Sequence, residues 1–108
     1  MLGQKVKITV IERSTKEDLL KKQGLLPAAG IVPCDLFEDG QEIIYKIGDR
    51  APAGFCEWVW SDMLKDILFV ASRYFFSPPE KRAEIPAHIV SCTDGTRPVI
   101  FKLEGISD

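Results

Sequence analysis

The sequence predicts an α+β fold in which an antiparallel sheet of about four strands packs one face against a long helix, with a short helix near the N-terminus. Two observations carry this prediction. Several short segments alternate apolar and polar residues, as strands with one buried face do. One segment, from Phe55 to about Phe76, repeats its apolar residues with the period of a helix and contains no glycine or proline. The 108 residues are expected to form a single domain, residues 1–108.

The first elements are a strand and a short helix. The strand is expected from Lys5 to Ile11, where every second residue is a valine or isoleucine. Thr15 then offers a capping hydroxyl with an acidic residue three places on, which predicts a helix start, and Gly24 predicts its end. Within this helix, Leu19 and Leu20 are expected to face inward.

The middle of the chain contains one strand between irregular segments. Residues 25–33 combine apolar residues with two prolines and a glycine, so they are expected to be irregular. Residues 42–47 place Ile43, Tyr45 and Ile47 on one side, as a strand would.

The long helix has two sides of different character. One side is the expected core face, made of Val59, Trp60, Met63, Leu64, Ile67, Ala71 and Tyr74. The opposite side carries Trp58, Asp62, Lys65, Phe69, Ser72 and Phe76. Its three aromatic residues fit two interpretations: loops of the same chain cover them, or they form a homodimer contact or a pocket wall.

A hairpin is expected at the C-terminus. The prolines at 78 and 79 end the long helix, and the mixed charges of residues 80–84 predict a solvated loop. Residues 88–92 and 98–104 then read as two strands joined by a turn that contains Asp94 and Gly95.

Composition and charge exclude several classes of partner. Fourteen basic against sixteen acidic residues leave a net charge of −2, without the positive excess that nucleic-acid binders need. The residues after Met1 show no apolar stretch of secretory-signal length, and charges interrupt the longest apolar segment, so a cytoplasmic protein without a membrane span is expected. An odd number of cysteines favours reduced thiols. No phosphate loop or dinucleotide fingerprint predicts a cofactor.

Three cysteines and one histidine match a common zinc ligand set in number but not in spacing. Cys34, Cys56 and Cys92 are isolated from one another, and His88 lies about 13 Å from Cys92 along an extended strand. We therefore predict no metal site.

Cys56 is the candidate nucleophile. If the long helix begins near residue 54 or 55, its thiol lies in the first turn, where the helix dipole stabilises a thiolate. The alternative is a small buried apolar residue at the helix start. A catalytic thiol needs a base, for which His88, Asp94 and Asp62 are the candidates. Asp94 is expected to serve the turn, and Arg97 either pairs with it or holds an anionic ligand.

Several segments together resemble a family of small uncharacterised prokaryotic proteins. The most specific are Gly-Phe-Cys-Glu-Trp at 54–58 and Cys-Thr-Asp-Gly-Thr-Arg-Pro-Val at 92–99, and the similarity covers nearly the whole chain. The resemblance implies that the family's characteristic positions are those of Cys34, Cys56, Trp58, Trp60, Cys92, Asp94 and Arg97. The chain departs from it at Ser91-Cys92, where members often carry two cysteines, and near the helix end at residues 71–76, where they often carry a glycine pair.

Two functions from different classes follow. The first is a small cytosolic binding or accessory module that self-associates through Trp58, Phe69 and Phe76, with Arg97, Trp58 and Trp60 as candidate ligand-binding residues. The second is a thiol-dependent enzyme or redox protein that uses Cys56 with Cys34 or Cys92, oriented by Asp94 or Arg97.

Overall fold

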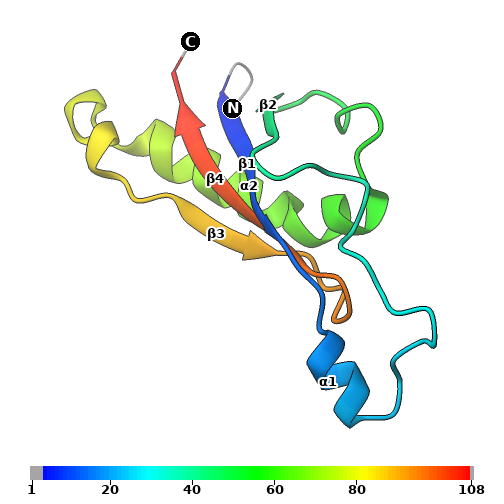
Figure 1. Ribbon diagram of the computed structural model, residues 1–108. Coiled ribbons are helices and arrows are strands. Elements are labelled where there is room, and N and C mark those ends of the chain that lie inside the picture. Colours follow the sequence, from blue (N-terminus) through cyan, green and yellow to red (C-terminus); the bar gives the residue numbers. More distant parts are fainter. Residues whose placement is uncertain (1–3, 108) are drawn as a thin grey trace.

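The computed structural model describes residues 4–107 and has the predicted α+β architecture, a four-stranded antiparallel sheet with one long helix across one face (Figure 1). The first three residues, which contributed to the argument against a secretory signal, lie outside the described range. The elements, in chain order, are β1 (Lys5–Arg13), α1 (Glu17–Lys22), β2 (Glu42–Lys46), α2 (Glu57–Phe76), the 3₁₀ helix η1 (Pro79–Glu84), β3 (His88–Ser91) and β4 (Val99–Ile106).

The strands are arranged in the order β2-β1-β4-β3, with every neighbouring pair antiparallel. The two ends of the chain therefore meet in the centre of the sheet, where β1 pairs with β4. A register shift between Val10 and Glu12 leaves Ile11 unpaired in a bulge. The predicted C-terminal hairpin is confirmed as β3 and β4, with Val90 opposite Phe101.

The core lies between the sheet and α2. Alternate residues of the central strands face the helix and are almost fully buried; they are Val6, Ile8, Val10, Val99, Phe101 and Leu103. The predicted core face of α2 is confirmed by Val59, Met63, Ile67 and Ala71, which are 4% exposed or less. Val70 is also buried, whereas Leu64 and Tyr74 are only half-buried.

The short helix differs from its prediction in two respects. Its N-cap residue is Lys16 rather than Thr15, and no side chain caps it. Only one of the two leucines faces inward, since Leu20 is buried and Leu19 is 52% exposed. The reason is the length of α1, which at six residues is too short to bury a wide apolar stripe.

An arm, residues 14–36, extends from the body of the molecule. Figure 1 shows α1 and the loop after it projecting beyond the sheet, near the turn between β3 and β4. The radius of gyration is 16.1 Å, against about 13 Å for a compact chain of this length. Leu20 is the one buried residue of the arm.

Residues 80–84 are expected to form a solvated loop; none of them is buried, as expected, but they are part of a helix. Residues 79–84 form η1, in which Pro79 occupies the first turn, where the missing N–H of proline is tolerated. The side chain of Arg82 donates to the carbonyl groups of Tyr74 and Phe75, over distances of 3.0 and 2.9 Å, and so satisfies two carbonyls at the end of α2. Within residues 4–107, no helix has the length and apolar character needed to cross a membrane.

Candidate functional site

Cys56 precedes the first turn of α2 instead of lying within it. Gly54 has a positive φ of 75°, and the Phe55 N–H bonds to the Pro52 carbonyl over 3.0 Å. This turn keeps the chain extended up to Cys56, which is therefore the N-cap residue. Its thiol is half-buried and makes no capping hydrogen bond to the helix.

Cys92 has a structural role in the β3–β4 hairpin. It is 9% exposed, and its backbone N–H donates to the carbonyl of Val99 over 3.0 Å. Its Sγ in turn accepts the N–H of Val99 at 3.2 Å. The thiol therefore accepts a hydrogen bond from a buried backbone N–H group next to the β3–β4 turn. Left unpaired, this N–H group would destabilise the fold.

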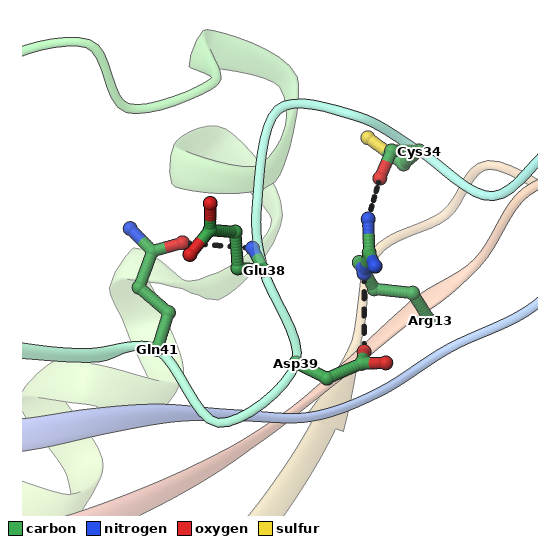
Figure 2. A network of polar contacts seen from close by, with 5 residues as sticks. All are labelled: Arg13, Cys34, Glu38, Asp39 and Gln41. Atoms are coloured by element: carbon green, nitrogen blue, oxygen red, sulfur yellow. Dashed lines mark hydrogen bonds and ion pairs between the residues drawn. The ribbon is translucent and has the colours of Figure 1, made fainter.

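Cys34 lies in a loop that is tied to the end of β1. Figure 2 shows the side chain of Arg13 between Cys34 and Asp39, which lie in the same connection between α1 and β2. The guanidinium donates to the Cys34 carbonyl at 2.8 Å and forms an ion pair with Asp39 at 3.0 Å. Gln41 accepts the N–H of Glu38 and closes the same loop. The backbone of Cys34 is thus fixed by a charge-assisted hydrogen bond.

The three thiols border one hydrophobic cluster. Cys92 belongs to it, and Cys34 and Cys56 pack against its edge as half-buried residues. All three are free thiols. In the part of the chain that the structure describes, no three His, Cys, Asp or Glu side chains gather in a group able to hold a metal ion.

Asp94 organises the turn between β3 and β4. Its Oδ1 accepts the backbone N–H groups of Thr96 and Arg97, at 2.9 and 3.2 Å, and the hydroxyl of Thr96 at 2.7 Å. The bonds from Thr96 are the main cause that lowers the pKa of Asp94 below its ordinary value of 3.8, and Arg97 adds to them against the effect of partial burial. The carboxylate therefore fixes the backbone that carries Arg97.

A polar network joins this turn to the outer face of α2. Trp58 Nε1 donates to the hydroxyl of Thr93 at 2.6 Å, and that hydroxyl donates to Asp62 at 2.9 Å. Asp62 also accepts the Thr93 N–H at 3.0 Å. The helical spacing places Trp58 and Asp62 on one side of the helix, but no local pattern reveals Thr93, because more than thirty residues separate it from them.

A second tie joins α2 to β3. His88 Nε2 lies 3.1 Å from Asp66 Oδ1, and the His88 ring packs edge-on against Phe69 with centroids 5.5 Å apart. The histidine is thus held against the helix by a carboxylate and an aromatic ring.

The outer face of α2 remains largely uncovered, despite these ties. Its large apolar side chains are 40 to 76% exposed; they are Trp58, Leu68, Phe69, Phe75 and Phe76. The β3–β4 hairpin contacts this face at the indole nitrogen of Trp58, through Thr93, and at the ring of Phe69, through His88. Trp60, in contrast, belongs to the interior, since its ring packs edge-on against Tyr45 and Phe55 with centroids 4.8 and 5.4 Å apart.

Comparison of the chain with family models, with curated proteins and with solved structures finds no match. The resemblance drawn from residues 54–58 and 92–99 therefore stays a prediction. Any function must be inferred from the residues of this chain. The exposed apolar side chains on the outer face of α2 are the feature from which we start.

Proposed function

We propose that the chain is a small cytosolic binding module that self-associates through the outer face of α2. One observation carries the proposal: five large apolar side chains lie exposed on one face of a single helix. Soluble monomers rarely leave a large contiguous apolar surface in water, and surfaces of this kind are typical of interfaces. Aromatic residues make up four of the five, which matches the composition of interface centres.

The spacing of the aromatic residues favours an antiparallel pair of α2 helices. Trp58 and Phe76 lie on the same side of the helix, eighteen residues apart and so about 27 Å along its axis. A two-fold axis near residue 67 would place Trp58 of one copy against Phe76 of the other. The same patch then serves both copies, as in the isologous interfaces of most homodimers.

Charge on the outer face favours the same orientation. Asp62 and Asp66 lie in the N-terminal half of α2, and Arg73 lies in the C-terminal half. All three point to one flank of the apolar face at about 100° per residue. An antiparallel pair brings Asp62 and Asp66 of one copy towards Arg73 of the other copy.

Sedimentation velocity over a range of concentrations tests the proposal. The wild type is expected to show a monomer–dimer equilibrium, and Phe76→Asp is expected to weaken it by about tenfold or more, because it places a charge where an aromatic ring meets Trp58 of the other copy. Ile44→Asp is the matched control, because Ile44 is 52% exposed on the opposite face of the sheet. A wild type that is monomeric at all concentrations, or equal weakening by both variants, would contradict the proposal.

A second candidate is a thiol-dependent enzyme or redox protein using Cys56 with Cys34 or Cys92. Its support is that three free thiols border one cluster and that two of them, Cys34 and Cys56, are half-buried and accessible in part. The alkylation rate of each cysteine by iodoacetamide distinguishes it. This candidate requires Cys56 to react faster in the folded protein than in the unfolded chain near neutral pH; slower labelling would eliminate it.

A further inference from the structure

A second uncovered apolar surface lies between the arm and the turn that carries Arg97. It is a pocket of about 490 Å³, within the range of small-molecule sites. One wall is apolar and comes from α1 and the loop after it; it consists of Leu20, Leu25, Pro27, Ile31 and Val32. The other wall is formed by Thr96 and Arg97.

The apolar wall leaves hydrophobic area in contact with water. Leu25 and Val32 are each 68% exposed, although they flank Leu20, the one buried residue of the arm. Backbone hydrogen bonds hold the wall in place, from the Leu25 N–H to the Leu20 carbonyl at 2.8 Å and from the Gly30 N–H to the Pro27 carbonyl at 2.9 Å. Burial of this area by a ligand is therefore favourable without refolding of the arm.

Arg97 is the charged residue of the pocket. Among residues 4–107, no carboxylate forms an ion pair with its guanidinium within 4.0 Å, and no acidic side chain lines the pocket. The charge that acts on it is that of Asp94, in the same turn. Its backbone is held by Asp94, and the neighbouring Thr96 carbonyl accepts the Lys16 N–H at 2.9 Å, so the turn is fastened to the arm. The backbone that carries Arg97 is thus fixed before any ligand binds.

We propose that this pocket binds a small amphiphile with an apolar body and a terminal carboxylate. The body would lie against the wall formed by Leu25 and Val32, and the carboxylate would accept paired hydrogen bonds from Arg97. A guanidinium matches a carboxylate in shape as well as in charge, and its bonds to one are stronger than those between neutral groups. The site is separate from the outer face of α2 and does not depend on self-association.

Titration of decanoate into ¹⁵N-labelled protein, followed by amide chemical shifts, tests the proposal. Saturable shifts are expected at residues 20–32 and 96–97. The Arg97→Met variant keeps the aliphatic stem and removes the charge, so it should weaken decanoate binding by about tenfold or more. Val32→Asp places a negative charge at the exposed wall and should weaken binding as well. Arg50→Met, at an exposed position outside the pocket, is the matched control and should leave the affinity unchanged.

Two further probes separate this site from general adsorption of an amphiphile. Acetate lacks the apolar body and decyltrimethylammonium lacks the negative charge, so neither is expected to saturate the pocket. Each variant is used only if its spectrum retains the dispersion of the wild type. Equal binding of the cationic probe, shifts that map elsewhere, or unchanged affinity in both Arg97→Met and Val32→Asp would overturn the proposal.

Discussion

The two faces of α2 are both rich in apolar residues, yet they have opposite environments. On the inner face, Met63 and Ile67 are 2 and 0% exposed because they pack against the sheet. On the outer face, Phe69 and Phe76 are 52 and 76% exposed, although they are larger. Hydrophobicity therefore does not decide burial within this chain; the presence of a sheet on one side does. A second copy of the chain is the occupant that we propose for the exposed outer face.

Neighbouring residues on the two faces should respond very differently to truncation. Ile67→Ala removes a fully buried side chain and should lower the free energy of unfolding by about 2–5 kcal/mol. Leu68→Ala, on the next residue, removes a side chain that is 40% exposed and should change it by about 0.5 kcal/mol or less in dilute monomer. Urea denaturation at low protein concentration measures both values. Similar losses in the two variants would mean that the faces are not energetically distinct.

Gly105→Ala probes how tightly the inner side of α2 meets the sheet. A Cβ at Gly105 would overlap Cβ and Cγ of Tyr74, so the helix or the strand must shift. The expected loss of stability is about 1–3 kcal/mol. Gly95→Ala is the matched control, because a Cβ there meets no atom within 4 Å. A thermal unfolding midpoint as high for Gly105→Ala as for Gly95→Ala would show that the contact is loose.

Thr93→Val tests the tie between the hairpin turn and the outer face. The substitution keeps the side-chain shape but removes the hydroxyl that joins Trp58 to Asp62. We expect a loss of about 0.5–1.5 kcal/mol in unfolding free energy, the value of a typical hydrogen bond. Trp58 fluorescence should also shift, since its indole N–H loses a partner. An unchanged emission spectrum would mean that the tie is not formed in solution.

Asp94 should make a smaller contribution that depends on pH. Its pKa is lowered in the folded protein, so the ionised carboxylate stabilises the fold above the ordinary value of 3.8. This contribution is lost as the pH falls through the lowered pKa. The stability difference between the wild type and Asp94→Asn should therefore be present at neutral pH and decrease as the pH falls through the lowered pKa. A difference that stays constant over the whole range would contradict the assigned role of the charge.

Local patterns were sufficient to predict most of the fold. Alternation identified the strands, and the helical period identified most of the buried residues of α2, because both patterns reflect which side of an element faces the core. The strand order was not predictable, since it depends on pairing between β1 and β4 at opposite ends of the chain. Local signals also failed in two places. The capping pattern at Thr15 placed the start of α1 one residue too early, and the prolines and charges of residues 78–84 did not reveal the 3₁₀ helix η1.

The candidate site was less predictable than the fold. The sequence placed Trp58, Phe69 and Phe76 on one side of a helix, but it left open whether loops cover them. Their exposure depends on where the β3–β4 turn lies, and Thr93 and His88 reach α2 only through tertiary packing. Cys56 is the N-cap residue and not part of the first turn because the chain turns at Gly54, which has a positive φ. The sequence does not predict a helix start to within one residue. The pocket beside Arg97 could not be anticipated, because α1 and the turn are brought together by the fold.

Contacts between Trp58 and Phe76 give the most direct test of self-association through α2. These residues are about 27 Å apart along one helix, so a nuclear Overhauser effect between them can arise only between two copies. A mixture of isotope-labelled and unlabelled protein, at a concentration where dimers sediment, isolates such intermolecular effects. The antiparallel arrangement predicts a Trp58–Phe76 signal that disappears on dilution. A dimer with no such signal, or one that instead shows Trp58 against Trp58, would contradict it.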